Sequence, residues 1–215
     1  MEAFQTHRGV LAPLDTANVD TDQIIAKQFL KSIKRTGFGE YLFYDWRYKA
    51  DGSPNADFPL NRPAFQKASI LVARNNFGCG SSREHAVWAV HQYGFKAVIA
   101  PRKGEGNARI PGFADIFRNN SGKNGLLTVE LGEAEVEEIF QMIGRFPGLE
   151  ATVDLDEQRV VLHLDEEISF HFDIDPAVKK RLYHGLDDIG TTLQEKAAID
   201  AFEKKHDAQF AAGKK

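Results

Sequence analysis

Residues 75–86, NNFGCGSSREHA, constrain the fold of this chain more than any other stretch, because they join two elements of different kinds. An apolar run at 69–73 precedes them, as expected of a buried strand. A helical pattern at 84–93 overlaps their end and stops at Gly94. A second apolar run, at 96–100, follows that glycine. Strand, helix and strand joined by short connections predict a βαβ unit, whose two strands lie parallel and adjacent.

The turn inside this stretch has the composition of an anion-binding site. Gly78 and Gly80 permit backbone conformations and close approach that a side chain would block. Unpaired backbone N–H groups and the positive end of the helix dipole would then face one point, beside the planar guanidinium of Arg83. Ser81 and Glu84 have the spacing of a capping box, which predicts Ser81 as the N-cap of the helix.

Three kinds of function stay open for this turn from its residues alone. A serine hydroxyl near a helix N-terminus and a guanidinium can serve as a proton acceptor. Cys79 could instead be the nucleophile of a hydrolase, with His85 or His91 as its base. The neighbours of Cys79 do not form the Gly-x-nucleophile-x-Gly pattern of an elbow turn, so a small buried thiol is the favoured interpretation. The third kind is a binding module that holds an anion without catalysis.

The composition excludes several classes of protein. Of the 215 residues 42% are hydrophobic and 27% charged, and the net charge of −4 argues against a nucleic-acid surface. One cysteine can form neither an intramolecular disulfide framework nor an iron–sulfur site of its own, which needs several thiolates. No metal site is predicted, because His163 and His171 have no third ligand in spacing. We expect a cytoplasmic protein, since neither a signal-peptide pattern nor an apolar run of membrane-spanning length occurs.

The rest of the chain predicts a mixed α/β fold. The expected elements are strands at 6–13 and 125–131, an amphipathic helix around 133–143, and an antiparallel meander at 152–155, 159–164 and 168–174. Asp175-Pro176 predicts the start of a short helix, and Thr192 with Glu195 predicts a capping box that opens the last one. We therefore expect a main domain at 1–175 and a C-terminal helical extension at 176–215.

A polar stretch near the N-terminus has two interpretations. Residues 15–23, DTANVDTDQ, hold three acids and two threonines just before Ile24 and Ile25. Such residues bond readily to the backbone, so one interpretation is an N-cap for a helix that enters at Ile24. The other is an acidic wall that positions a catalytic group nearby.

At the level of whole motifs the chain resembles a known family. Residues 76–86, NFGCGSSREHA, look like the signature of the swivelling domain of the aconitase superfamily. Further matches are VDTDQII at 19–25, KQFL at 27–30, FADIF at 113–117 and NGLL at 124–127. With them the chain, from about Phe4 to about Phe202, resembles the small subunits of bacterial 3-isopropylmalate dehydratase.

The resemblance implies a fold, a partner and a reaction. The fold would be of the β/β/α swivelling type, with a parallel βαβ core, a C-terminal β meander and terminal helices. The chain would form a heterodimer with a large subunit that carries a [4Fe–4S] cluster, which agrees with the single cysteine here. The reaction would be that of a hydro-lyase of leucine biosynthesis, which isomerises 2-isopropylmalate to 3-isopropylmalate through 2-isopropylmaleate.

The resemblance also implies roles for the residues that match the family's motifs. Ser81 would be the catalytic base as its alkoxide, Ser82 would supply hydrogen bonds, and Arg83 would hold a substrate carboxylate. Residues 28–35 match the loop that tunes the substrate's third substituent. The residues implied in substrate binding are Gly80, Phe29, Leu30, Lys31 and Ile33. Those implied in ordering the catalytic loop are Asp20, Thr21, Asp22, Glu84 and His85.

One segment departs from the family's pattern. The chain inserts residues 103–112 where an almost direct run into Phe113 is expected, and Gly112 stands where a serine is frequent. Because the insertion follows the strand after the catalytic helix, it can reach the active-site side or the partner. A related small subunit that acts on another alkylmalate, such as a methylmalate, is therefore the alternative.

Overall fold

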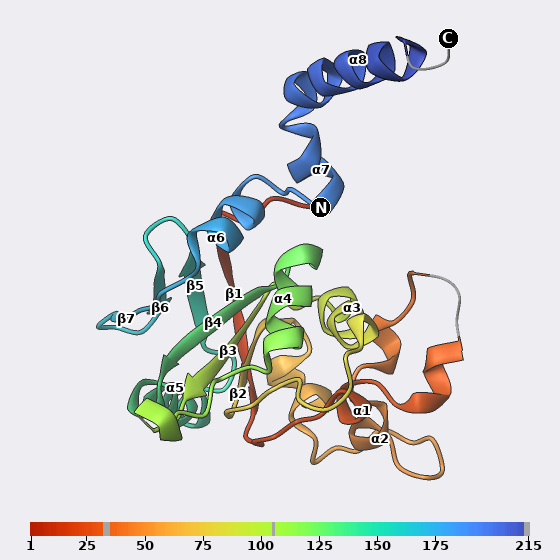
Figure 1. Ribbon diagram of the computed structural model, residues 1–215. Coiled ribbons are helices and arrows are strands. Elements are labelled where there is room, and N and C mark those ends of the chain that lie inside the picture. Colours follow the sequence, from red (N-terminus) through yellow and green to blue (C-terminus); the bar gives the residue numbers. More distant parts are fainter. Residues whose placement is uncertain (32–34, 105, 213–215) are drawn as a thin grey trace.

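The computed structural model describes residues 1–31, 35–104 and 106–212, and in them one seven-stranded sheet is flanked by helices (Figure 1). The strands are β1 (Thr6–Leu14), β2 (Ala68–Ala73), β3 (Ala97–Arg102), β4 (Leu127–Gly132), β5 (Glu150–Asp154), β6 (Arg159–Leu162) and β7 (Ile168–His171). Their order across the sheet is β4-β3-β2-β1-β5-β6-β7. The four strands from β4 to β1 are parallel, and β5, β6 and β7 extend the sheet in antiparallel fashion. The predicted α/β fold with a C-terminal meander is thereby confirmed.

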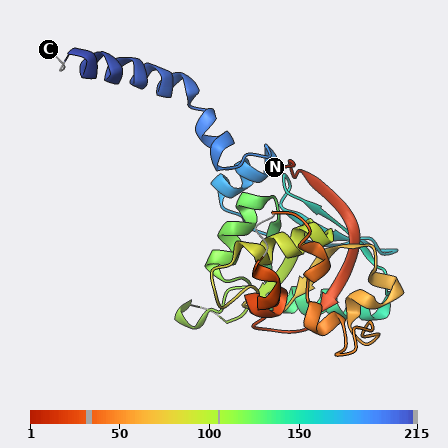
Figure 2. The same ribbon diagram turned by 90° about the vertical axis from the view of Figure 1, so that its right-hand side faces the viewer.

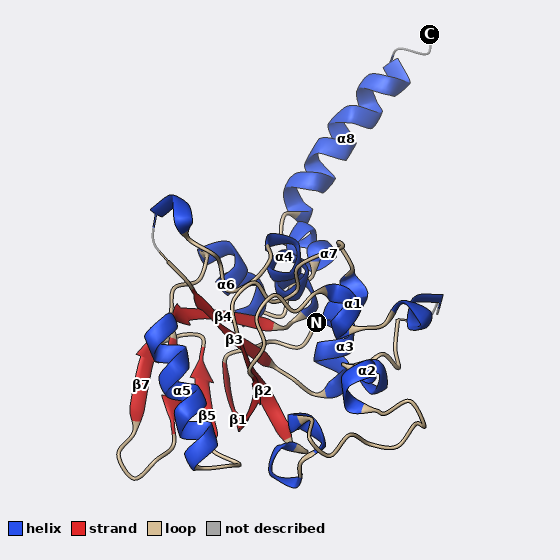
Figure 3. Cartoon of the chain, turned by 90° about the horizontal axis from the view of Figure 1, so that it is seen from below, coloured by secondary structure: helices blue, strands red, loops and turns tan. Residues whose placement is uncertain are grey.

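Helices of different lengths cover the sheet and its loops. The α-helices are α1 (Thr21–Ile24), α2 (Tyr44–Arg47), α3 (Glu84–Tyr93), α4 (Asp115–Asn124), α5 (Glu133–Arg145), α6 (Pro176–Tyr183), α7 (Asp188–Leu193) and α8 (Lys196–Ala212). Short 3-10 helices occur at Lys27–Lys31, Gly39–Tyr41, Pro59–Asn61, Pro63–Phe65 and Gly106–Ala108. Figure 3 shows α3 and α4 on one side of the sheet and α5 on the other.

The predicted βαβ unit is present as β2, α3 and β3. The two strands pair in parallel, with Leu71 opposite Val98. Residues 70–73 and 97–100 are fully buried, because helices cover both faces of the sheet at this point. Gly94 ends α3 with a φ of 124°, a conformation that a side chain disfavours. The continuous apolar runs and the glycine that ends the helix were therefore sufficient to locate this βαβ unit in the sequence.

The predicted capping box at the start of α3 is wrong. The helix begins at Glu84, its N-cap is Arg83, and no side chain caps it. Ser81 lies two residues before that cap, at a bend of the chain. The Glu84 carboxylate accepts instead from the Asn124 side chain of α4, at 3.0 Å. Tertiary contact with α4 thus replaces the local bond that the spacing indicated.

The second predicted capping box, at Thr192, is wrong as well. Thr192 lies inside α7, and its hydroxyl donates to the carbonyl of Asp188 at 2.9 Å. Asp187 caps that helix, accepting from the Gly190 N–H at 2.6 Å. Thr192 therefore belongs to α7, and the last helix, α8, begins only at Lys196.

The C-terminal helices differ in how they meet the sheet. Asp175 caps α6 as predicted, and Leu182 of that helix is fully buried and accepts from the Phe4 N–H at 2.9 Å. Helices α7 and α8 project away from the body (Figures 1 and 2). The division at residue 175 stays a prediction. Within the described residues, no helix is both long enough and apolar enough to cross a membrane.

Candidate active site

The glycine loop, defined here as residues 75–83, leaves the carboxyl end of β2 and ends where α3 begins. In open α/β sheets, ligands bind outside the carboxyl ends of the strands. Two other segments run alongside the loop and are bonded to it. They are called below the acidic segment (residues 18–22) and the brace (residues 110–114).

The acidic segment is joined to the loop by backbone bonds. The Gly78 N–H donates to the carbonyl of Val19 at 2.8 Å, and the Thr21 N–H donates to the carbonyl of Cys79 at 2.9 Å. The Thr21 hydroxyl adds a bond of 3.0 Å to the Ser81 carbonyl. Loop and acidic segment are therefore held in register, although 60 residues separate Thr21 from Ser81 in the sequence.

The brace holds the other side of the loop. The N–H groups of Asn76 and Phe77 donate to the carbonyls of Pro111 and Gly112, each at 2.9 Å. The Ala114 N–H returns a bond of 3.0 Å to the Phe77 carbonyl. The rings of Phe77, Phe113 and Phe117 are buried together beneath these bonds. The start of the loop is thus fixed by main-chain bonds on both sides and by an aromatic cluster below.

The two glycines of the loop have different constraints. Gly78 has a φ of +76°, and a Cβ placed there would lie 2.3 to 2.5 Å from the Phe117 side chain. Gly80 has a φ of +89°, but the nearest atom to such a Cβ is 3.4 Å away, on Asp20. Both positions favour glycine by conformation, and Gly78 also requires it for packing.

Ser81 and Ser82 are exposed, and within the described part of the chain neither hydroxyl has a hydrogen-bond partner. They lie immediately before the N-terminus of α3, where backbone N–H groups are unpaired and the dipole favours negative charge. The loop therefore presents two uncommitted hydroxyls on a fixed backbone, at an electropositive point.

Arg83 forms an ion pair with Asp22 of the acidic segment. Its side chain is 21% exposed and that of Asp22 is 37% exposed, so the pair is partly withdrawn from water. Asp22 also lies 3.1 Å from the ammonium group of Lys27. One carboxylate thus pairs with two cations, of which Arg83 directly follows the serines, and Arg83 has further N–H donors for an anion.

Asp20 has the capping role that one interpretation of the acidic stretch predicted. Its carboxylate accepts from the Gln23 N–H at 2.8 Å, and the Gln23 side chain accepts from the Asp20 N–H at 2.8 Å. This capping box starts the single turn of α1. The position of Asp22 beside Arg83 agrees with the other interpretation, so neighbouring acids of one turn serve both purposes.

The segment implied to tune substrate choice is only partly described. Phe29 stacks on Tyr41 with ring centroids 4.1 Å apart, and meets Tyr44 edge-on at 4.9 Å. Leu30 is half-buried, and Lys31 ends the 3-10 helix that begins at Lys27. Ile33 lies outside the described residues. Aromatic packing therefore anchors the entry to this segment.

Glu84 and His85 turn away from the serines. The His85 ring lies between Phe38 and Trp88, with centroid distances of 5.2 and 4.8 Å. The Glu84 carboxylate bonds to Asn124 of α4. Both side chains therefore contact residues of α3 or of the elements packed against it, and not the glycine loop. Any effect of Glu84 or His85 on the order of the loop must act through α3.

Cys79 has the properties of a protonated thiol. It is half-buried, and burial, with the negative charge of Asp20 as a second cause, raises the pKa of the thiol above its ordinary value. A nucleophilic cysteine needs a lowered pKa. The surroundings of Cys79 therefore oppose a thiolate at neutral pH.

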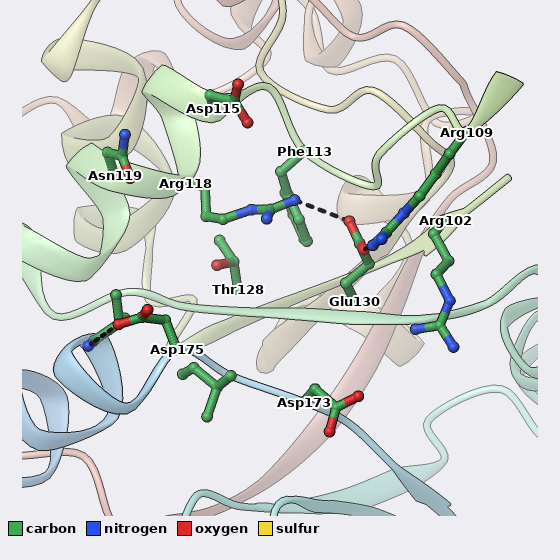
Figure 4. A pocket seen from close by; sticks show the side chains of 12 residues that line it. Arg102, Arg109, Phe113, Asp115, Arg118, Asn119, Thr128, Glu130, Asp173 and Asp175 are labelled. Atoms are coloured by element: carbon green, nitrogen blue, oxygen red, sulfur yellow. Dashed lines mark hydrogen bonds and ion pairs between the residues drawn. The ribbon is translucent and has the colours of Figure 1, made fainter. Parts of the chain in front are cut away.

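A cavity of about 800 Å³ lies beside the brace (Figure 4), and neither Ser81 nor Ser82 lines it. Its lining includes Arg102, Arg109, Phe113, Asp115, Arg118, Glu130 and Asp175. Glu130, on β4, accepts from three donors of this region, and sequence reasoning did not single it out. The one available signal was an acid at an alternate position of the strand predicted at 125–131.

The described residues contain no group of three or more His, Cys, Asp or Glu side chains that could hold a metal ion. Cys79 is the chain's one cysteine. An iron–sulfur cluster therefore does not fit the donor set of this chain.

The parallel core, the glycine loop and the two segments beside it define a domain of the aconitase C-terminal type. Residues 1–134 match the family model for the aconitase C-terminal domain. Residues 137–176 match the model LeuD_N, and residues 188–210 match the C-terminal domain of the 3-isopropylmalate dehydratase small subunit.

Two relatives narrow the family. The chain is 54% identical over 205 residues to the 3-isopropylmalate dehydratase small subunit of Desulforapulum autotrophicum, covering 95% of this chain and 96% of that one. The crystal structure of a 3-isopropylmalate dehydratase from Methanocaldococcus jannaschii has the same fold, with a TM-score of 0.62 and 23% identity over 92% of this chain and 99% of that chain. The chain belongs to the family of 3-isopropylmalate dehydratase small subunits.

Proposed function

We propose that this chain is the substrate-binding and proton-transferring half of a 3-isopropylmalate dehydratase, which interconverts 2-isopropylmalate and 3-isopropylmalate through 2-isopropylmaleate. The observation that carries the proposal is the pair of unpaired, exposed hydroxyls of Ser81 and Ser82 on a loop fixed from both sides. This arrangement does not serve to start the helix, because neither serine caps α3. It supports a catalytic use.

Each of the three residues has a chemical task. The Ser81 alkoxide, stabilised by Arg83 and the N-terminus of α3, takes the proton from the carbon next to a substrate carboxylate. That carbon then forms a double bond as the hydroxyl group on the neighbouring carbon leaves as hydroxide, and this hydroxide and the proton now on Ser81 together make up the water that is lost. Arg83 holds a carboxylate in a two-pronged bond, and Ser82 donates a hydrogen bond to it. Returning the proton and the hydroxide with their positions on the two carbons exchanged gives the isomer.

The other half of the site would come from a large subunit. A [4Fe–4S] cluster held there would supply the Lewis acid that a leaving hydroxyl group needs. The loop is open to solvent in this chain, so a partner must cover it before a serine alkoxide can be shielded from water. The single cysteine supports both the location of the cluster on the partner and a reducing, cytoplasmic setting.

The substrate's isopropyl group requires apolar surface near the serines. Phe29 and Leu30 are half-buried and lie on the segment that follows α1, so they are candidates for this lining together with Ile33. Lys31, in the same segment, is a candidate for binding the substrate through its charge. The relative from Desulforapulum autotrophicum carries the isopropylmalate name, which favours this substrate over a methylmalate. A panel of alkylmalates given to the assembled enzyme tests the choice.

The central experiment is Ser81→Ala in enzyme assembled with the large subunit. We expect kcat to fall about 10²- to 10⁴-fold, the usual contribution of a positioned base, while assembly and unfolding midpoint stay unchanged. Ser169→Ala is the matched control, because Ser169 is also an exposed serine and lies on β7, at the far edge of the sheet. A Ser81→Ala enzyme with the kcat of the Ser169→Ala enzyme would remove Ser81 from the mechanism.

A further inference from the structure

Glu130 lies on β4, and its carboxylate is the meeting point of three donors. Oε2 accepts from the Gly112 N–H at 2.8 Å and from the Arg118 guanidinium at 2.9 Å. Oε1 pairs with the guanidinium of Arg109. The Glu130 side chain is only 13% exposed, whereas those of Arg109 and Arg118 are 51% and 39% exposed. Figure 4 shows both arginines converging on this carboxylate.

These three donors come from different parts of one region. Arg109 and Gly112 belong to the insertion at 103–112, and Arg118 belongs to α4. The insertion closes on itself through reciprocal bonds of 2.9 and 2.7 Å between the backbones of Lys103 and Ile110. Glu130 therefore fixes the end of the insertion, residues 109–112, against β4 and the start of α4.

Gly112 transmits this fixation to the glycine loop. Its N–H is held by Glu130, and its carbonyl accepts from the Phe77 N–H at 2.9 Å. A Cβ at Gly112 would lie 2.9 Å from the carbonyl oxygen of Ala100, so the residue is pressed against β3. Gly112 thus connects the Glu130 carboxylate to Phe77, from which the backbone leads to Ser81.

We propose that Glu130 is a positioning residue: by holding Arg109, Arg118 and the Gly112 N–H, it sets the brace along which the glycine loop lies, and so the orientation of Ser81. The inference rests on the proposed role of Ser81 as base. It gives the insertion a use, since the insertion supplies two of the three donors. Without the carboxylate, Gly112 loses its N–H partner and the two guanidinium groups lose their common anchor.

The test compares Glu130→Ala and Glu130→Gln with Glu133→Gln in enzyme assembled with the large subunit. Glu133 is the matched control, because it also pairs with a residue of the insertion, Lys103 at 3.2 Å, but its side chain is 53% exposed. We expect kcat to fall about 10- to 100-fold in Glu130→Ala with KM changed less than threefold, as for a misplaced base. Glu130→Gln keeps one acceptor oxygen and should recover part of kcat, and Glu133→Gln should match the unmodified enzyme.

Amide hydrogen exchange gives a readout independent of turnover. The N–H groups of Asn76 and Phe77 should exchange faster in Glu130→Ala, while those of Leu71 and Ile99 in the central strands should not change. If Glu130→Ala does not fold, Arg118→Gln and Arg109→Gln each remove one donor and should show smaller shifts in the same direction. A kcat within twofold of Glu133→Gln, or unchanged exchange at residues 76 and 77, would overturn the proposal.

The same preparations separate this inference from the proposed function. Loss of activity in Ser81→Ala with normal activity in Glu130→Ala would refute the positioning role alone. Normal activity in Ser81→Ala would refute the base, and faster exchange in Glu130→Ala would then show only that the brace controls the loop, leaving no catalytic positioning to propose.

Discussion

The two ends of β2 carry polar side chains that are used in opposite ways. At the carboxyl end, Ser81 and Ser82 are exposed and unpaired within the described chain. At the amino end, the Ser69 hydroxyl lies 2.7 Å from Nε2 of His7. Lys96, at the start of β3, is bonded to the Glu2 carboxylate at 2.7 Å. Polar groups at the amino end satisfy one another, whereas those at the carboxyl end are left for a ligand.

The difference predicts which measurements each end should affect. Changes at the carboxyl end should alter activity more than stability, because the serines make no contact that folding needs. Changes at the amino end should alter stability and its pH dependence, because the polar groups there are paired with one another without a ligand. The predictions below run from the largest expected effect to the smallest, and the first concerns a residue that does not follow the division.

Gly78→Ala should be the most damaging single change in the glycine loop. The left-handed φ of +76° and contacts of 2.3 to 2.5 Å with Phe117 oppose a methyl group there. Together they should cost about 3 kcal/mol of unfolding free energy, measured by urea denaturation. Gly80→Ala is the control, because it shares the positive φ but has room for the methyl group, and should cost about 1 kcal/mol. Equal losses would show that conformation, not packing on Phe117, limits the loop.

Asp22→Asn should show whether the ion pair with Arg83 orients the arginine for catalysis or stabilises the fold. It keeps the size of the side chain but removes the charge paired with Arg83. Because the pair is partly exposed, we expect stability to fall by no more than about 1 kcal/mol, and kcat/KM by about threefold to tenfold. Lys27→Gln removes the other partner of Asp22. Because the Lys27 side chain is 72% exposed, this change should leave both the stability and kcat/KM unchanged. A stability loss well above this, without a change in kcat/KM, would make the ion pair structural.

The amino end should make stability depend on pH. Burial, followed by the positive charge of Lys96, lowers the pKa of both His7 and His91 below the ordinary value of 6.5, while Glu2 acts in the opposite direction. The unfolded chain therefore binds protons more readily near that pH, so stability is complete above 6.5 and declines as the pH falls. The double variant His7→Gln/His91→Gln should have a flatter urea midpoint between about pH 7.5 and about pH 5. An unchanged slope would assign the acid sensitivity to other groups.

The sequence predicted the parts of this architecture that depend on neighbouring residues. The βαβ core, α5 and the meander follow from apolar periodicity interrupted by glycine, and Asp175 caps α6 as its pairing with a proline indicated. The N-cap of α3 was wrongly assigned to Ser81 because the bond that Glu84 makes, to Asn124 of α4, joins residues 40 apart. Local spacing cannot represent such a contact.

The candidate site also has a part that the sequence predicted and a part that only the structure showed. A motif of consecutive residues was enough to indicate the loop with its serines and arginine. Glu130 was missed because its three donors lie 12 to 21 residues away, and none of them forms a pattern with it. The two sides of the loop also needed the structure, since only the folded chain brings the acidic segment and the brace against residues 76–79. Sequence thus indicates which groups do chemistry, and the fold shows what holds them.

Cys79 should show the smallest effect, although it lies in the middle of the loop. Burial raises the pKa of its thiol, so little thiolate forms at neutral pH and alkylation by iodoacetamide should accelerate only as the pH passes above the ordinary thiol pKa of 9.0. Cys79→Ala should keep kcat within about twofold and stability within about 0.5 kcal/mol, because the side chain is half-buried and makes no catalytic contact in the proposal. Rapid alkylation at pH 7, with loss of turnover in Cys79→Ala and none in Ser81→Ala, would move the chemistry from hydroxyl to thiol. That result would keep the contrast between the paired polar groups at the amino end of β2 and the reactive groups at its carboxyl end. It would change only which group at the carboxyl end is reactive.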